Sequence, residues 1–360
     1  MDVTLTRLGF STWFENNLRE NQGSAFVPAR VTAVHKDAYL VRDERGEYSA
    51  ELSGRFLFHS DSSLDMPTAG DWVAVEIYND HTLAIIHSLY PRRTVLKRKS
   101  AGEHADVQLI AANIDTAFIM QTCSEDFNVR RLERYLVTAR DGGVEPVILL
   151  SKSDLVSSEI ASGRMESIRS VEREADVFLF SNTTGDGLEA IRSRLQEGRT
   201  FCLLGSSGVG KTTLLNNLIG REAFVTKSIR PGDEKGRHAT SRRQLVLLET
   251  GGILIDTPGM RELGVVGGEQ GITSTFPEIA ELIPFCRFTD CTHTGEEGCA
   301  VIGAVNEGRL DPDRYRSFIK LRKESAFNEM SYLERRKRDK AFGRMCKSVM
   351  THRKKSRGEE

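Results

Sequence analysis

One segment of this chain has the residue types and spacing to hold the phosphates of a nucleotide. Residues 205–213 read Gly-Ser-Ser-Gly-Val-Gly-Lys-Thr-Thr and match the pattern GxxxxGK(S/T) in full. The glycines let backbone N–H groups curl around phosphate oxygens, Lys211 is expected to reach the β- and γ-phosphates, and the Thr212 hydroxyl is expected to bind Mg²⁺. The predicted phosphate-binding residues are Gly205, Ser206, Ser207, Gly208, Val209, Gly210, Lys211, Thr212 and Thr213. A strand expected before the motif and a helix expected after it favour this P-loop over an ordinary glycine-rich turn.

A guanine-binding segment is predicted upstream of the P-loop. Ser151-Lys152-Ser153-Asp154 follows the apolar strand Val147–Leu150. The Asp154 carboxylate can accept hydrogen bonds from guanine N1–H and from the 2-amino group, whereas adenine offers no matching donors. Lys152 can lie over the base and hold the loop. The alternative for this segment alone is a plain strand–turn with a helix cap.

Two further features refine this base-binding prediction. Ser151 stands where asparagine or threonine is usual, and its shorter side chain is expected to brace the loop less strongly. One βα unit later, Ser181 and Asn182 follow another expected strand, and their backbone can contact the carbonyl edge of guanine. By composition alone the second segment is an ordinary loop, so its position carries the prediction.

A segment on the γ-phosphate side is also expected. An apolar strand ends at Asp256, and the chain continues with Thr257-Pro258-Gly259. Asp256 can hold Mg²⁺ through water, and the Gly259 N–H can face the γ-phosphate. Alone this is a common turn sequence, and its place after the P-loop gives it meaning.

The polar, glycine-rich stretch 229–241 is typical of a switch loop. Thr240 in it is expected to close on Mg²⁺ and the γ-phosphate, and the alternative is a solvated loop whose threonine binds nothing. Met260 stands where many GTPases place the glutamine that orients the attacking water, which methionine cannot do. Our hypothesis is that His238 positions that water. The alternatives are a group supplied by a partner and an ordinary surface histidine.

The order of these motifs is inverted. In an ordinary GTPase the P-loop comes first and the base-binding motif near the end, whereas here Asp154 precedes Gly205. The sequence therefore predicts a circularly permuted GTPase core. Strands alternating with helices from Asp115 to Ile255 predict an α/β fold with a mostly parallel sheet. The stretches Gln244–Leu248 and Gly252–Ile255 are expected to form an antiparallel hairpin.

Cysteine and histidine cluster in the C-terminal part. Four soft ligands, Cys286, Cys291, His293 and Cys299, lie within one short loop. Three thiolates and one imidazole suit a closed, structural Zn²⁺ site, and the alternative is a set of unrelated buried cysteines. A helical stretch is expected from about Asp311 to Gly343. The basic run Arg335–Arg338 and the residues after it predict contact with RNA, or else a solvated helix face.

The N-terminal part predicts a small barrel after a helical extension. Five short β-rich runs lie between Ala29 and Ile86, which fits an OB-fold, although an SH3-like barrel would look similar. A helix is expected over Leu5–Asn21. The formal net charge of −1 gives no global attraction to nucleic acid. No apolar run of about 18 residues occurs and Met1–Glu20 lack a signal-peptide core, so a cytoplasmic protein without a membrane span is expected.

Together these segments resemble one family, the circularly permuted ribosome-biogenesis GTPases called RsgA or YjeQ. The resemblance runs from about Pro28 to Arg338 and includes Gly236–Ser241, which is similar to the Gly-Arg-His-Thr-Thr-Thr segment of the family. It implies an N-terminal OB-fold, a permuted GTPase core and a C-terminal zinc-binding, mostly helical domain. It also implies GTP hydrolysis stimulated by the small ribosomal subunit, late in maturation of that subunit. Ser151 and the extension before Pro28 depart from the family pattern.

The resulting prediction is a GTP hydrolase with Mg²⁺ and one structural Zn²⁺, whose partners are GTP or GDP and the small ribosomal subunit with its rRNA, as a monomer. One alternative is an RNA-binding nucleotide switch with negligible turnover, and another is a P-loop ATPase unrelated to ribosomes. The expected domains are a helical extension (1–27), an OB-fold (28–95), the GTPase core (96–272), a zinc-binding domain (273–345) and a basic tail (346–360).

Overall fold

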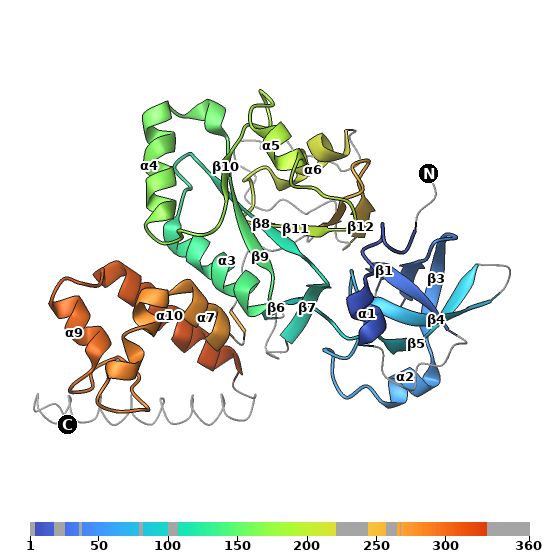
Figure 1. Cartoon of the computed structure of the whole chain (residues 1–360), viewed down its shortest axis with the longest axis horizontal. Helices are drawn as coiled ribbons and strands as arrows, with labels where there is room; N and C mark the ends of the chain where they lie inside the picture. The colour runs from blue at the N-terminus through green and yellow to red at the C-terminus, as the bar shows by residue number, and fades with distance from the viewer. Residues whose placement is uncertain are drawn as a thin grey trace, which may run out of the picture.

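The computed structural model of the chain describes residues 4–17, 26–35, 38–78, 82–99, 107–220, 244–256, 265–266 and 268–329. Figure 1 shows three parts: a β-barrel at the N-terminal end, a central sheet flanked by helices, and a C-terminal group of helices. Among the described residues, no helix is long and apolar enough to cross a membrane.

The barrel has the strand order of an OB-fold. Its elements are β1 (Val27–His35), β2 (Ala38–Arg42), β3 (Glu47–Leu52), α2 (Gly54–Phe58), β4 (Trp72–Tyr78) and β5 (Leu83–Leu89). The strands are paired in the order β1-β2-β3-β5-β4, and β4 pairs again with β1 to close the barrel. The β3–β5 pair is parallel, and α2 lies in the chain between β3 and β4. This arrangement confirms the OB-fold over the SH3-like alternative.

The N-terminal segment packs across the barrel rather than forming the long helix expected from Leu5. Within residues 4–17, the helix α1 covers Thr12–Asn16, and residues 5–9 form turns. Gly9 explains the later start, because its φ is 86° and a Cβ there would lie 2.9 Å from the carbonyl oxygen of Gly198. Leu8 and Phe14 of this segment are buried with Trp72 and Tyr90 of the barrel.

A buried arginine joins the N-terminal segment, the barrel and the core. The Arg30 side chain on β1 donates hydrogen bonds to the carbonyl oxygens of Leu8, Gly70 (3.3 Å) and Asn113 (3.1 Å), and to the Thr200 hydroxyl (2.8 Å). Burial lowers the pKa of Arg30 to about 10, so the group keeps its charge at neutral pH. These bonds fix the barrel against the core.

The central sheet confirms the predicted α/β core. Five strands run parallel in the order β10-β9-β8-β11-β13, and β12 pairs antiparallel with β13 as expected. The strands are β8 (Thr116–Thr122), β9 (Glu145–Ser151), β10 (Val177–Leu179), β11 (Thr200–Gly205), β12 (Gln244–Leu247) and β13 (Ile253–Asp256). Beyond β12 the sheet continues into the barrel, because Ala33 of β1 pairs with Gln244.

Helices cover both faces of this sheet (Figure 1). Residues of α3 (Val129–Asp141) and α4 (Ser158–Arg169) join one core cluster, and residues of α5 (Leu188–Arg192) and α6 (Lys211–Ile219) join another. A two-stranded sheet, β6 (Val95–Lys99) with β7 (Val107–Ala112), lies between barrel and core. Only two of the five residues of β6, Val95 and Leu96, are apolar, so this strand lacks the sequence pattern of a buried strand.

The C-terminal part is helical and docks on α3. Its elements are α7 (Glu269–Thr275), α8 (Pro277–Ala280), the short 3₁₀ helix η2 (Ile283–Phe285), α9 (Ala300–Asn306) and α10 (Pro312–Glu329). Residues 330–343 of the predicted long helix and the basic tail lie outside the described residues. At the junction with the core, Glu133 of α3 is fully buried and accepts hydrogen bonds from Arg314 (2.7 Å) and Ser317 of α10.

Candidate nucleotide and zinc sites

The predicted P-loop lies between β11 and α6, where the sequence placed it. Gly205 ends β11 and Lys211 begins α6. Gly210 has a φ of 98°, and a Cβ on it would lie 2.7 Å from the Asn182 side chain, so this position requires glycine. The Lys211 ammonium donates to the carbonyl oxygens of Gly205 (2.8 Å) and Ser206 (2.7 Å). Its positive charge is thereby held within the loop that is expected to take the phosphates.

The predicted guanine-binding residues follow two neighbouring parallel strands at the same edge of the sheet as the P-loop. Ser151 ends β9, and Asp154 lies exposed in the 3₁₀ helix η1 (Ser153–Leu155). Ser181 follows β10, and its hydroxyl accepts from the N–H groups of Thr183 and Thr184, both at 3.1 Å. The Ser153 N–H donates to the Phe180 carbonyl at 3.2 Å and links the two loops.

Lys152 adopts an uncommon backbone conformation at this edge. Its φ is 60°, in the left-handed region, between the end of β9 and the start of η1. Such a conformation costs free energy in a residue other than glycine, so the surrounding structure must hold it. The turn places Asp154 beyond the edge of the sheet, where a ligand can reach the carboxylate.

Ser151 contacts the P-loop directly. Its buried hydroxyl donates to the Val209 carbonyl at 2.7 Å, and the Gln121 carbonyl lies at 3.1 Å. The serine side chain is therefore long enough to join the base-binding loop to the P-loop, although the sequence interpretation expected weaker bracing.

Replacing Ser151 by alanine is expected to weaken GTP binding about tenfold, because the Val209 carbonyl would lose its buried donor, at a cost of about 1–3 kcal/mol. Titration of a fluorescent GTP analogue measures this loss. Ser151→Thr keeps the hydroxyl and serves as the control. Wild-type affinity in Ser151→Ala would contradict the bracing role.

The Asn182 side chain also points to the P-loop. Its amide nitrogen donates to the Gly210 carbonyl at 3.1 Å, and its amide oxygen accepts from Asn217 of α6 at 3.1 Å. From the sequence, only the backbone at Asn182 was expected to contact the nucleotide. The signal in the sequence was a carboxamide side chain one βα unit after the predicted base-binding motif. Such a side chain can donate and accept hydrogen bonds, and here it joins this loop to the P-loop as Ser151 does.

Asp256 is placed beside the P-loop strand. It ends β13, where it pairs with Gln244 of β12, and the preceding residue Ile255 pairs with Cys202 of β11. Thr212, the other described residue predicted to bind Mg²⁺, lies in the first turn of α6. His238, Thr240 and Gly259 lie outside the described residues.

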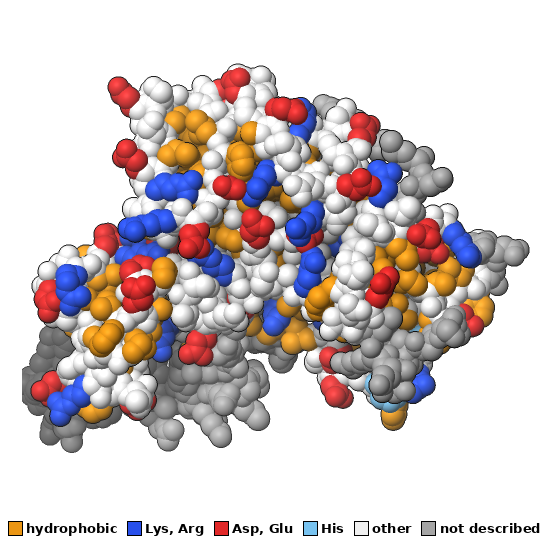
Figure 2. Space-filling model, viewed as in Figure 1, with side chains coloured by type: hydrophobic (Ala, Val, Ile, Leu, Met, Phe, Trp, Pro, Cys, Tyr) orange, Lys and Arg blue, Asp and Glu red, His pale blue; other side chains and the backbone are white. Residues whose placement is uncertain are grey.

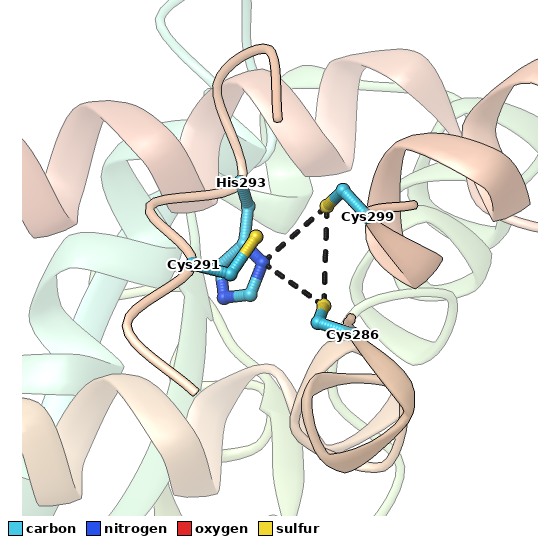
Figure 3. Close-up of side chains that lie close together, drawn as sticks. All are labelled: Cys286, Cys291, His293 and Cys299. Atoms are coloured by element: carbon cyan, nitrogen blue, oxygen red, sulfur yellow. Dashed lines mark hydrogen bonds between the residues drawn. The ribbon is translucent and has the colours of Figure 1, made fainter. Parts of the chain in front are cut away.

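The four predicted zinc ligands converge in the C-terminal part (Figure 3). The ligand atoms of Cys286, Cys291, His293 and Cys299 all lie within 4.8 Å of one another. His293 Nδ1 is 3.5 Å from the sulfurs of Cys286 and Cys299, and those two sulfurs are 4.0 Å apart. Tetrahedral zinc has bonds of about 2.3 Å to sulfur and about 2.0 Å to nitrogen. This geometry requires a separation of about 3.5 Å between the nitrogen and each sulfur and of about 3.8 Å between two sulfurs. The donor set and the spacing therefore fit Zn²⁺ bound through Nδ1.

Backbone contacts hold this zinc loop in shape. The Glu296 carboxylate accepts from the N–H groups of Thr292 (2.8 Å), Thr294 (2.9 Å) and Gly295 (3.1 Å). The Tyr315 hydroxyl of α10 donates to the His293 carbonyl at 2.6 Å. With four protein ligands no coordination position stays open, so the site is suited to a structural role.

These sites define the class of protein. The predicted P-loop between β11 and α6, preceded in the chain by the predicted base-binding loop at the same sheet edge, has the motif order expected of a circularly permuted GTPase. The fold is similar to the crystal structure of YjeQ from Thermotoga maritima, with 24% identity and a TM-score of 0.61, covering 82% of this chain and 97% of that chain. It is also similar to YloQ, described as a circularly permuted GTPase, with 24% identity and a TM-score of 0.60, covering 88% and 100%.

The family follows from sequence comparison. A family model described as RsgA GTPase matches residues 89–266. The small ribosomal subunit biogenesis GTPase RsgA of Opitutus terrae is 40% identical, over 90% of this chain and 90% of that protein. A second relative, RsgA 2 of Lactiplantibacillus plantarum, carries the same description and is 41% identical over 95% and 96%. The chain belongs to the RsgA family of GTPases, which are hydrolases acting on GTP.

Proposed function

We propose that this GTPase is a late assembly factor of the small ribosomal subunit, and that the subunit stimulates its hydrolysis of GTP. The observation that carries the proposal is the meeting of Asp154, Ser151 and the P-loop at one sheet edge, in a chain whose relatives are named for biogenesis of this subunit. We infer that the protein acts as a monomer in the cytoplasm.

Asp154 is proposed to select guanine. Replacing it by asparagine presents an N–H donor to the 2-amino group of guanine, whereas xanthine offers a carbonyl there. Asp154→Asn is therefore expected to lower GTP affinity by at least about 100-fold and to favour xanthosine triphosphate. Competition between the two nucleotides measures the change.

Glu159→Gln removes another exposed carboxylate in the next helix, α4, and should leave the preference for GTP unchanged. A variant Asp154→Asn that still prefers GTP to xanthosine triphosphate would rule out this role for Asp154. Preference of the wild-type protein for ATP would instead favour the ATPase alternative.

The phosphate-binding residues are assigned in the same proposal. The backbone of residues 205–213 would surround the phosphates, and Lys211 would neutralise charge on the β- and γ-phosphates. Thr212, Thr240 and Asp256 would hold Mg²⁺, which would neutralise negative charge on the phosphates. The Gly259 N–H would contact the γ-phosphate.

His238 is proposed to position the attacking water, because Met260 cannot. His238→Ala is expected to lower subunit-stimulated turnover about 100-fold while nucleotide affinity stays unchanged, as for loss of a group that orients water in the transition state. Steady-state phosphate release with small subunits measures it. Unchanged stimulated turnover would refute the role.

RNA contact is proposed for the barrel, the C-terminal part with the four zinc ligands, and the basic residues from Arg335 onward. On the face drawn in Figure 2, basic and acidic side chains are interspersed over the core. That mixture of charges favours RNA contacts through the barrel, the C-terminal part and the residues from Arg335 onward rather than through this face of the core.

A further inference from the structure

Helix α10 holds the backbone of Val265 from both sides. The Val265 N–H donates to Glu324 Oε1 at 3.1 Å, and Asn328 Nδ2 donates to the Val265 carbonyl at 2.7 Å. Val265 is 2% exposed and lies outside any helix or strand. A buried backbone without secondary structure needs partners for both of its polar groups, and here two side chains four residues apart on one helix face supply them.

The contact between α10 and Val265 also involves helix α3 of the GTPase core. Arg134 of α3 forms an ion pair with the same Glu324 oxygen that accepts from Val265. The Val265 side chain belongs to the core cluster that includes Val137 of α3. A Cβ on Gly268 would lie 3.1 Å from Val265 Cγ1, so the chain passes closely here. Val265 is therefore fixed to α10 and α3 together.

Val265 lies at the downstream end of the connection that carries Gly259. Strand β13 ends at Asp256, and residues 257–264 connect it to Val265. That connection includes Gly259, whose N–H is assigned to the γ-phosphate in the proposed function. The sheet thus fixes the upstream end, and α10 fixes the downstream end.

We propose that Glu324 and Asn328 are positioning residues for GTP hydrolysis. They act by fixing Val265, which lies at the downstream end of the connection that carries Gly259. This inference rests on the proposed function. The γ-phosphate is present in GTP and absent from GDP, so fixing this segment contributes to triphosphate binding and turnover but not to GDP binding. By reciprocity, the triphosphate stabilises the attachment of Val265 to α10.

The test compares variants that break and keep the two hydrogen bonds. Asn328→Asp is nearly isosteric but removes the donor to the Val265 carbonyl, and Glu324→Ala removes the acceptor of the Val265 N–H. Glu324→Gln keeps an acceptor oxygen while losing the charge that pairs with Arg134. Ala326→Ser, at an exposed position on the same helix, is the matched control.

The readouts are the affinities for fluorescent GDP and for a non-hydrolysable GTP analogue, and single-turnover hydrolysis of GTP. In Asn328→Asp and Glu324→Ala, we expect the affinity for the GTP analogue and the hydrolysis rate to fall about tenfold, within the usual range of coupling between sites. GDP affinity should stay within about twofold, since it depends on the P-loop and Asp154. Glu324→Gln should restore most of the loss, and Ala326→Ser should behave as wild type.

Equal losses of GDP and GTP-analogue affinity, or no loss of either, would overturn the inference. Glu324 is 23% exposed, so Glu324→Ala keeps the test available if the buried substitution Asn328→Asp prevents folding. Failure of the wild-type protein to hydrolyse GTP would instead reject the proposed function, so the two failures are distinguishable.

Discussion

Replacing Cys291 by serine is expected to abolish binding of the Zn²⁺ that we propose for Cys286, Cys291, His293 and Cys299, and to unfold the C-terminal helices. Cys291 and Cys299 belong to the same buried cluster as Phe276, Phe318 and Leu321 of these helices. Structural zinc contributes about 10 kcal/mol or more to the folding of small domains, which a hydroxyl ligand cannot replace. Zinc content by mass spectrometry and limited proteolysis of residues 268–329 would measure both effects.

Cys202 provides the control for Cys291. It is a buried thiol in β11, outside the zinc cluster, so Cys202→Ala should leave the zinc content unchanged. The P-loop belongs to another core cluster, so Cys291→Ser should still bind GDP. One equivalent of zinc in Cys291→Ser, together with wild-type resistance to protease, would contradict the assigned site.

Replacing Arg314 by alanine is expected to destabilise the junction between α10 and the core by about 3 kcal/mol, the range for breaking a buried ion pair. The substitution removes the hydrogen bond from Arg314 to the fully buried Glu133. Glu133 then keeps only Arg130 and Ser317 as hydrogen-bond donors among the described residues. It also removes a bond of 2.6 Å to the Thr275 carbonyl and the contact of the guanidinium with the Phe276 ring. Denaturant unfolding, followed by a probe in the C-terminal helices, measures the loss.

Arg316 on the same helix is the matched control. Its side chain is 68% exposed and pairs with Asp313 three residues earlier. Exposed pairs of this kind contribute little, so Arg316→Ala should change stability by less than about 0.5 kcal/mol. Equal effects of the two substitutions would show that the buried contact with Glu133 does not hold the junction.

The sequence predicted the elements whose patterns are local. The five barrel strands, the parallel core and the P-loop carry period-two alternation, apolar runs or glycine signals that can be recognised within a few residues. The convergence of Cys286, Cys291, His293 and Cys299 could be predicted because their spacing is short.

Contacts between distant segments could not be predicted in this way. The bonds from Arg30 to Leu8, Asn113 and Thr200, and the Glu133–Arg314 pair, join residues whose sequence neighbours give no signal of the partner. The expected start of the N-terminal helix at Leu5 was wrong, because α1 begins at Thr12. Apolar periodicity does not reveal that the chain must turn at Gly9, where it lies close to Gly198. Such contacts depend on the packing of whole domains.

The most direct test of the account is release of phosphate from GTP by the purified protein, with and without small ribosomal subunits. We predict slow hydrolysis by the protein alone and faster hydrolysis when small subunits are added, lost in Lys211→Ala, with no stimulation by large subunits. A wild-type protein that binds GTP and the small subunit but shows the same negligible turnover with and without it would contradict the account, and would favour an RNA-binding nucleotide switch.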